Sequence, residues 1–430
     1  MDAFMIRGGT PLNGTVPISG SKNSALPLLA ATLMADGPTR LDGVPRLSDI
    51  DSMIKLLGEL GCHVQRGEAV DGLDGPLTVE VRDAESCEAR YDIVKTMRAS
   101  VCVIGPMLAR RGRITFSIPG GCAIGDRPID LHLRGLEKLG ARFTHDGGNI
   151  VGHVDGRLRG TTVYLGGASG PTVLGTINVM SAATLAEGST TIVGAACEPE
   201  VSDCANLLNK MGAKITGMGG PIIRIEGVDE LQAVEHRVIP DRIEAGTFLI
   251  AGAITGGDLK LTNANAGHLH ALIDRLADCG VSVSHDDTSM TVHGNDATIT
   301  HTEFATQPYP GFPTDLQAQL MALLCFGDGM SVITERIFPD RFTHVAELNR
   351  MGARIRKEGP SAFVAGTEKL QPARVMCSDL RASAALVLAA LGIHGETRVD
   401  RIYHIDRGYE AIEAKLQNVG ADIERVVVDQ

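Results

Sequence analysis

The stretch 116–134, FSIPGGCAIGDRPIDLHLR, holds the most reactive side chain that stands in an irregular, glycine-rich setting. Pro119 and three glycines disfavour helix and strand there, so Cys122 and Arg127 are expected on a solvent-reachable loop. Asp130 is expected to open a helix directly afterwards. A nearby arginine and a helix start both favour a thiolate, which suits Cys122 to acid–base or nucleophilic chemistry. The alternative is an ordinary packed cysteine.

Basic residues recur where other helices are expected to begin. Lys22 and Asn23 stand in GSKNSALP, where a glycine turn enters an apolar helix whose start attracts anions. Asp315 follows two prolines in YPGFPTDLQAQ and is the candidate base. Asp379 precedes the apolar helix RASAALVLAALG. The basic set suits a substrate that carries phosphate and carboxylate groups: Lys22, Arg98, Arg127, Arg381 and Arg407.

Each of these residues also has an ordinary structural interpretation. Lys22 could be an exposed lysine at a domain edge. Arg98 interrupts an apolar helix, so it is either paired in a structural ion pair or faces a cleft. Asp315 could simply cap a helix, and Arg407, beside Gly408, could be solvated.

These residues sit on six copies of one unit: an apolar helix, Gly, strand, loop, amphipathic helix, Gly. A buried strand residue is expected four places after each first glycine, and the second glycine should end the amphipathic helix in a left-handed turn. The second copy is the longest, and its extra residues coincide with the Cys122 loop. The first glycines are Gly37, Gly112, Gly188, Gly257, Gly329 and Gly395, and the second are Gly61, Gly140, Gly212, Gly280, Gly352 and Gly420.

The two kinds of helix differ in their faces. Segments such as RASAALVLAALG are apolar nearly all round, so they should be buried inside the domains. In SDIDSMIKLLGELG apolar residues line one face, and Ser48 is expected to cap the start. Because each copy mixes strands with helices, the sequence predicts an α/β (α+β) protein of two three-unit domains.

The amino-acid composition argues against some classes of binding partner. The chain has 430 residues, a formal net charge of −12 and only 3% aromatic residues, which argues against nucleic acid or an anionic membrane as partner. No apolar run is long enough for a membrane span. Nine cysteines without a C-x-x-C pair indicate free thiols in a reducing cytosol, with no zinc site. No signal peptide is expected.

In this order and spacing, GSKNSALP, KTMRAS, PGGCAIGDRPIDLH, TLAEG, EPE, PDRIEAGTF, FPTDLQAQ, SDLRAS and DRIYHIDRGYE resemble the UDP-N-acetylglucosamine 1-carboxyvinyltransferase family from end to end. The resemblance implies the two-domain enolpyruvyl transferase fold, an inside-out α/β barrel of six βαβαββ units with buried helices. It implies one domain over 22–239, a second formed by 1–21 and 240–430, and an active site in the interdomain cleft.

The resemblance also implies a reaction and roles. The enolpyruvyl group of phosphoenolpyruvate moves to the 3-hydroxyl of UDP-N-acetylglucosamine through a tetrahedral ketal, phosphate leaves, and no metal or organic cofactor takes part. Cys122 would be the general acid and the target of fosfomycin, Asp315 the base, and Lys22 and Arg407 would act with them. Substrate contacts are implied for Lys22, Asn23, Arg98, Arg127, Pro128, Asp130, Leu131, Thr172, Val173, Gly175, Asp315, Ile337, Asp379, Arg381 and Arg407.

One departure and two alternatives remain. This chain reads T-V-L-G-T over 172–176 where the family usually reads S-V-G-A-T, which puts the diphosphate contacts of that segment in doubt. A 5-enolpyruvylshikimate 3-phosphate synthase would use the same chemistry but lacks the PGGC loop. A non-catalytic paralogue that binds the nucleotide sugar is the other alternative. The implied setting is the bacterial cytoplasm, in peptidoglycan synthesis.

Overall fold

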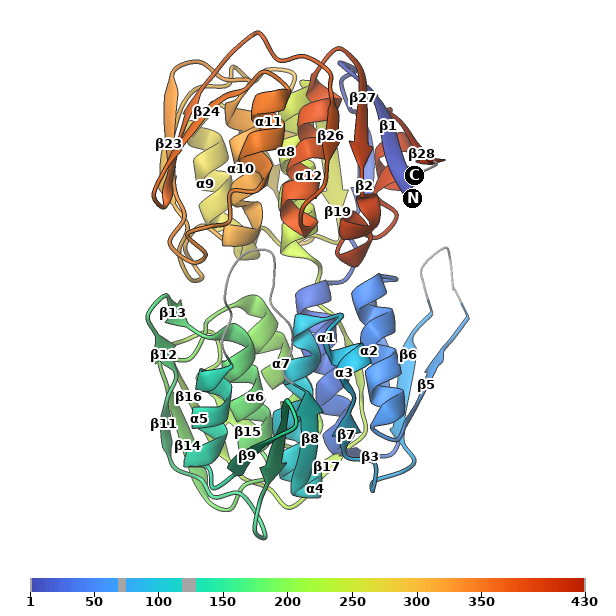
Figure 1. Ribbon diagram of the computed structural model, residues 1–430, viewed down its shortest axis with the longest axis vertical. Coiled ribbons are helices and arrows are strands. Elements are labelled where there is room, and N and C mark those ends of the chain that lie inside the picture. The colour runs from blue at the N-terminus through green and yellow to red at the C-terminus, as the bar shows by residue number, and fades with distance from the viewer. Residues whose placement is uncertain (1, 69–74, 118–128, 429–430) are drawn as a thin grey trace. The chain divides into compact units, whose positions relative to one another are not determined.

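The computed structural model describes residues 2–68, 75–117 and 129–428. They divide into two compact units (Figure 1). One unit contains the chain up to Ser19 and from Pro240 onward, and the other contains the described residues between Gly20 and Ile239. Each unit has its own hydrophobic core, and neither core draws on residues of the other unit.

Three four-stranded sheets of one design surround each unit in the described part of the chain. In each sheet, a short edge strand pairs in parallel with a long strand, and the other two pairings are antiparallel. In the unit between Gly20 and Ile239 the sheet orders are β18 (Glu235–Arg237), β4 (Thr39–Asp42), β6 (Leu77–Val81), β5 (Cys62–Arg66); β7 (Glu88–Ala89), β8 (Arg113–Ser117), β10 (Asn149–His153), β9 (Arg142–Asp146); and β11 (Thr162–Tyr164), β14 (Ser189–Val193), β16 (Ile222–Glu226), β15 (Lys214–Thr216).

The other unit is completed by the N-terminal strands. Strand β1 lies between β27 and β28 in antiparallel register, and β2 supplies the parallel edge strand of another sheet. The sheet orders there are β2 (Gly14–Pro17), β19 (Asp258–Thr262), β21 (Ser289–His293), β20 (Ser282–His285); β22 (Glu303–Ala305), β23 (Met330–Thr334), β25 (Ser361–Ala365), β24 (Arg354–Glu358); and β26 (Arg374–Met376), β27 (Gly395–Asp400), β1 (Asp2–Gly8), β28 (Asp422–Val427).

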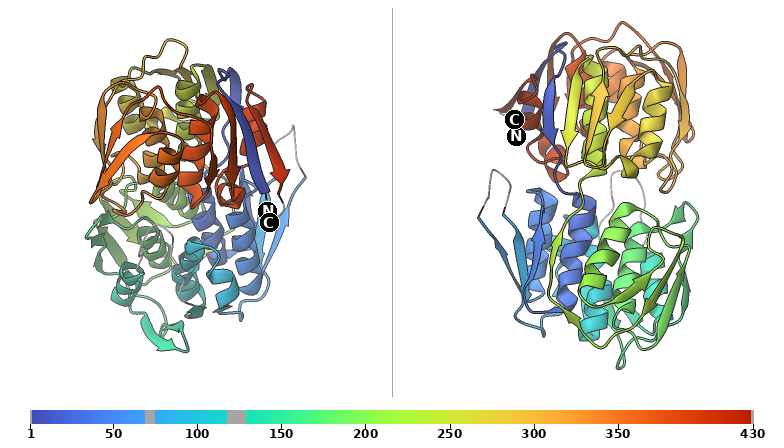
Figure 2. Two further views of the ribbon diagram at one scale, coloured as in Figure 1. Left: turned by 45° about the horizontal axis from the view of Figure 1, so that its top comes forward. Right: turned by 180° about the vertical axis from the view of Figure 1, so that it is seen from behind.

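Buried helices fill the middle of each unit, and the strands lie outside them (Figures 1 and 2). Every residue of α10 is buried, as is the whole of α8 from Ile243 to Ile254. Because these helices are apolar on all sides, only the interior can accommodate them. The inner helices are α1 (Lys22–Ala31), α4 (Ile104–Arg111), α6 (Val173–Ala183), α8 (Arg242–Thr255), α10 (Gln317–Leu324) and α12 (Leu380–Gly392).

The amphipathic helices each bury one face and expose the other. They are α2 (Ser48–Glu59), α5 (Asp130–Lys138), α7 (Pro199–Lys210), α9 (His270–Asp278), α11 (His344–Arg350) and α13 (Ile412–Gln417). Short 3₁₀ segments η2 (Arg98–Val103), η4 (Thr314–Leu316) and η5 (Ile402–Arg407) precede or replace helical turns. Among the described residues, no helix is both long enough and apolar enough to span a membrane.

The glycine pattern places the elements as predicted. The six strand residues that follow the first glycines, from Leu41 to Val399, all lie in strands and are 0% exposed. The six closing glycines all have positive φ, so each supplies the left-handed turn that only glycine adopts freely. Two details were wrong. Gly256 (φ 68°), not Gly257, ends α8, and Leu47 rather than Ser48 occupies the N-cap of α2, because Ser48 already belongs to its first turn.

Candidate active site

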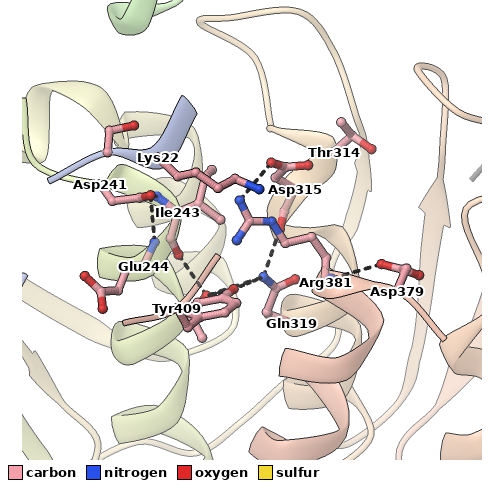
Figure 3. Close-up of polar contacts among 12 residues, drawn as sticks. Lys22, Asp241, Ile243, Glu244, Thr314, Asp315, Gln319, Asp379, Arg381 and Tyr409 are labelled. Atoms are coloured by element: carbon pink, nitrogen blue, oxygen red, sulfur yellow. Dashed lines mark hydrogen bonds and ion pairs between the residues drawn. The ribbon is translucent and has the colours of Figure 1, made fainter. Parts of the chain in front are cut away.

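Asp315 is held by two arginines. It lies in η4, where its Oδ1 accepts a hydrogen bond from Arg341 Nη1 at 2.7 Å. Its Oδ2 accepts one from Arg381 Nη2 at 3.0 Å (Figure 3). The side chain does not cap the segment, so the N-cap interpretation of Asp315 is wrong. The arginine side chains are 8% and 2% exposed, against 25% for Asp315. The carboxylate is thus the accessible end of a buried ion-pair cluster.

The start of α12 fixes Arg381. Asp379 is the N-cap, and its Oδ1 accepts hydrogen bonds from the backbone N–H groups of Arg381 and Ala382 at 2.9 and 3.1 Å. The guanidinium lies 5.3 Å from the centre of the Tyr409 ring (Figure 3). Burial alone would lower the pKa of Arg381, but the neighbouring Asp315 and Tyr409 outweigh it and raise that pKa. Arg381 is therefore a fixed, permanent cation.

Glu335 joins the segments around Asp315. This carboxylate is 0% exposed. Its Oε1 accepts from the N–H groups of Ile337 (2.8 Å) and Phe338 (3.0 Å), and its Oε2 accepts from the hydroxyl of Thr314 (2.9 Å). The Thr314 oxygen also accepts from Arg341 at 3.0 Å. Ile337 and Asp315, both expected site residues, are therefore positioned by one buried carboxylate.

Arg407 ends η5 and is half-buried, so a fully solvated arginine is not what the structure has. Burial, and then the charge of Arg407, lowers the pKa of the neighbouring His404. This histidine is therefore held neutral beside the cation. The side chain beside the proposed cation Arg407 is thus a neutral group that does not compete with it for an anion.

Lys22 opens α1 in the other unit. It is 8% exposed and pairs through Nζ with Asp49 Oδ2 at 3.1 Å, so the exposed-lysine interpretation is wrong. Ser21 caps the helix by accepting from the N–H of Ser24, and Asn23 follows in the same first turn. The hydroxyl of Ser24 donates to Asp203, which also accepts from His236 at 2.8 Å. The first turn of α1, which carries Lys22 and Asn23, is thus anchored by buried hydrogen bonds.

The remaining expected residues of that unit begin three further segments. Arg98 is the first residue of η2, and Asp130 and Leu131 open α5. Thr172 caps α6, its hydroxyl accepting from the N–H of Gly175 at 3.2 Å, so Val173 and Gly175 lie in a helical first turn. The T-V-L-G-T segment, whose sequence differs from the usual one of the family, therefore still forms a helix N-terminus, which is the feature that suits a diphosphate.

Cys122, Arg127 and Pro128 lie outside the described residues. The described cysteines contrast with the chemistry expected of Cys122. Burial raises the pKa of Cys62 to about 11 and of Cys102, Cys279, Cys325 and Cys377 to about 12. Thiols of that kind are poor nucleophiles at neutral pH. In the part of the chain that the structure describes, no cluster of three or more metal-ligating side chains occurs.

Relatives of full length share half of the sequence. The protein from Methylacidiphilum infernorum named UDP-N-acetylglucosamine 1-carboxyvinyltransferase is 50% identical over 426 residues, 99% of each chain. Proteins of the same name from Pseudoalteromonas atlantica and Nitratidesulfovibrio vulgaris are 48% and 51% identical over 99% of this chain and 100% and 99% of theirs. The chain belongs to this family of carboxyvinyltransferases.

The wider superfamily agrees. The family model described as EPSP synthase (3-phosphoshikimate 1-carboxyvinyltransferase) matches residues 6–416. The enolpyruvyl transferase NikO from Streptomyces tendae covers 100% of this chain and 99% of its own, with a TM-score of 0.88 at 24% identity. EPSP synthase from Acinetobacter baumannii covers 99% and 100%, with a TM-score of 0.75 at 16% identity. The predicted enolpyruvyl transferase fold, with its repeated α/β units and inner helices, is confirmed.

Sequence reasoning missed several residues that organise the site of this carboxyvinyltransferase. Arg341 and Glu335 hold Asp315 and Ile337, and Tyr409 supports Arg381. Arg341 stands in FPDRF, near Ile337, with no feature that sets it apart from a surface arginine. Tyr409 falls inside the DRGYE motif but carries no charge. Only their burial beside Asp315 reveals them.

Proposed function

We propose that the chain transfers the enolpyruvyl group of phosphoenolpyruvate to the 3-hydroxyl of UDP-N-acetylglucosamine and releases phosphate. The observation that carries the proposal is the identity of about half over essentially the whole chain with relatives of that printed name. The setting of Asp315 supports it through position and not through basicity: two buried arginines fix a carboxylate that is still 25% exposed, where it can take the proton of a sugar hydroxyl.

The reaction proceeds by addition and elimination. In the addition, the sugar hydroxyl gives its proton to Asp315 while its oxygen bonds to C2 of phosphoenolpyruvate, and Cys122 protonates C3. In the elimination, the Cys122 thiolate takes a proton from C3, the double bond forms again, and the C2–O bond to phosphate breaks. Phosphate leaves with the bond electrons and takes up the proton held by Asp315. Lys22, Arg98, Arg127 and Arg407 neutralise the phosphate and carboxylate charges. The steps need no redox change and no metal.

The substrate contacts follow the residues expected of the family. Arg127, Pro128, Asp130 and Leu131 would line the uridine end, with the first turn of α6 at the diphosphate. Asn23 and Asp315 would position the sugar, and Ile337, Asp379, Arg381 and Arg407 would complete the site. We also propose that the domains extend over 22–239 and over 1–21 with 240–430, and that they close around both substrates in the cleft between them.

Finer roles belong to the same proposal. The product would enter peptidoglycan synthesis in the bacterial cytoplasm as its first committed intermediate, and so would bear on cell shape and division. Fosfomycin would inactivate the enzyme by forming a bond to Cys122. Nucleic acid and membrane insertion have no part in this function.

Phosphate release from phosphoenolpyruvate tests the proposal. UDP-N-acetylglucosamine is expected to support release and shikimate 3-phosphate is not, and Cys122→Ser is expected to remove most of the activity because a serine hydroxyl is a far weaker acid than a thiol. Cys87→Ser, at a described cysteine outside the site, is the matched control and should keep full activity.

The outcomes separate the alternatives. Release with shikimate 3-phosphate instead would point to the synthase alternative. No release with either acceptor would leave a non-catalytic sugar-nucleotide binder. Full activity of Cys122→Ser, or fosfomycin labelling confined to another cysteine, would remove the assigned acid.

A further inference from the structure

Asn178, in the middle of α6, joins two neighbouring segments through its side-chain amide. The residue is 0% exposed. Its Oδ1 accepts from the backbone N–H of Gly105 at 2.7 Å, and its Nδ2 donates to the backbone carbonyl of Val101 at 2.7 Å. Val101 lies in η2 and Gly105 in the first turn of α4. The amide therefore supplies partners to the backbone groups that a junction between two helical segments leaves unsatisfied.

Gly105 is shaped to admit this amide. A Cβ atom at Gly105 would lie 2.2 Å from the backbone oxygen of Asn178 and 2.7 Å from its Oδ1. No side chain larger than hydrogen fits there without moving α4 away from α6. Asn178 and Gly105 thus form a matched pair, in which the glycine permits the close approach and the asparagine uses it.

The same amide reaches α5. Its Nδ2 lies 3.0 Å from Nδ1 of His132, which is 5% exposed. The two backbone partners fix which amide atom is nitrogen, so Nδ1 of His132 must accept, and the imidazole proton is on Nε2. Burial, and then the charge of Arg98, lowers the pKa of His132 to about 3, so the ring stays neutral at physiological pH. A neutral ring is the form this contact requires.

The three segments that meet at Asn178 all carry expected substrate contacts: Arg98 of η2 is expected at phosphate and carboxylate groups, and the starts of α5 and α6 are expected at the nucleotide sugar. Arg98 begins η2, Asp130 and Leu131 begin α5, and Thr172 to Gly175 begin α6 itself, one turn before Asn178. A shift of any of these segments would move its contacts with respect to the other two. Asn178 belongs to α6 and bonds to η2, α4 and α5, so it is in the position to set the register of these segments.

We propose that Asn178 is a positioning residue for UDP-sugar binding, which acts by holding η2, α5 and α6 in register through its three hydrogen bonds. This role rests on the proposed function, since the contacts it positions are those expected for its substrates. Asn178 is not among the residues expected to touch substrate. It acts through Arg98, Asp130, Leu131 and the first turn of α6.

Calorimetric titration of the purified full chain with UDP-N-acetylglucosamine tests the role directly, since it needs no turnover. Asn178→Ala is expected to raise the Kd by on the order of tenfold, because it leaves two backbone groups unsatisfied and frees three segments. Gly105→Ala should act in the same direction. The Gly105 amide should also exchange its hydrogen faster in Asn178→Ala than in the wild type, as mass spectrometry of peptides across 98–111 would record.

Asn209→Ala is the matched control. The side chain of Asn209 also forms two backbone hydrogen bonds in this unit, with the N–H and carbonyl of Ile215, and that partner lies in β15 (Lys214–Thr216), outside the three segments. It should lose stability with an unchanged Kd. If Asn178→Ala does not fold, His132→Phe removes only the third bond and should still raise the Kd, by a smaller factor.

The outcomes are distinct. Wild-type affinity in Asn178→Ala, or in His132→Phe where the first variant does not fold, would overturn the positioning role. So would an equal rise of Kd in Asn209→Ala, since the effect would then be general loosening of the unit. If the wild type itself binds no UDP-N-acetylglucosamine, the proposed function fails, and the positioning role fails with it.

Discussion

At the scale of single residues, the proposed base Asp315 has its geometry decided by neighbours that do no chemistry themselves. Two arginines hold its two oxygens, and Thr314, the preceding residue, is bound by both Arg341 and Glu335. A displacement of about 1 Å at a reacting group can cost on the order of 100-fold in rate. The buried carboxylate of Glu335 should therefore affect turnover without touching substrate.

Glu335→Gln tests this. The amide would keep the shape of the side chain but would remove its negative charge, and with it the charge-assisted strength of the bonds from the Thr306 and Thr314 hydroxyls and from two backbone N–H groups. We expect kcat to fall by on the order of 10- to 100-fold. Steady-state phosphate release measures it, and Glu303→Gln, at an exposed glutamate of β22, should be silent. An unchanged kcat in Glu335→Gln would show that η4 keeps its place without this carboxylate.

The residues with an unusual setting in the sequence were identifiable, and the supporting ones were not. Lys22, Asp315 and Arg381 stand at helix starts, where a charge has a local reason to matter, and the structure places all three there. Glu335, Arg341 and Asn178 occupy ordinary positions in strand ends, loops and helices. What distinguishes them is burial beside partners 21 to 77 positions away, which no local pattern encodes.

At the scale of elements, glycine destabilises a helix interior but relieves strain at a positive φ. Two glycines of one unit show one effect each. Gly58 lies inside α2 and Gly140 follows α5 with φ 106°, and a Cβ at either would meet no atom within 4 Å. In a helix glycine costs stability, because the unfolded chain loses more freedom there. At positive φ it is instead the residue that avoids strain.

Alanine at the two positions should therefore have opposite effects. Gly58→Ala is expected to stabilise its unit by about 0.5–1 kcal/mol, and Gly140→Ala to destabilise it by about 1–2 kcal/mol. Urea unfolding followed by circular dichroism gives both values. Because neither site is crowded, backbone conformation alone should decide the sign of each effect. Two effects of the same sign would contradict this explanation.

The repeated helix–glycine–strand pattern was strong enough to predict all six copies, since helix faces and left-handed glycines are local properties. The edge strands were not predictable in this way. β7 and β26 have only two and three residues, and β18 and β2 pair with strands distant in sequence. The insertion of β1 between β27 and β28 joins the two ends of the chain, so tertiary pairing rather than local pattern decides it.

At the scale of the whole molecule, each unit holds a buried histidine that stays neutral. His132 lies in one unit and His344, which is 1% exposed, in the other. Burial is the main cause in both, and it lowers the pKa of His132 to about 3 and that of His344 to about 4. Charging either ring inside its core is unfavourable, so both units should respond to mild acid.

The sign follows from proton binding. Unfolded histidines titrate near about 6.5, so between that pH and about 4 the unfolded chain binds more protons than the folded one. The free energy of unfolding should therefore fall as the pH falls, with a limiting slope of about 1.4 kcal/mol per pH unit for each histidine. Glu244 opposes part of this loss, because burial raises its pKa despite Lys415 and the folded state takes up that proton first.

Urea unfolding from pH 7 to pH 5 measures how steeply the free energy of unfolding depends on pH. In the unit that contains β1, His344→Gln should reduce this slope by up to the contribution of one proton. His285→Gln removes an exposed histidine of the same unit and should leave the slope as in the wild type. If the stability of the unit that contains β1 does not change from pH 7 to pH 5, or if the slope changes equally in both variants, His344 does not govern the acid response of that unit. A slope lost only in His344→Gln would assign it to a single side chain in the core.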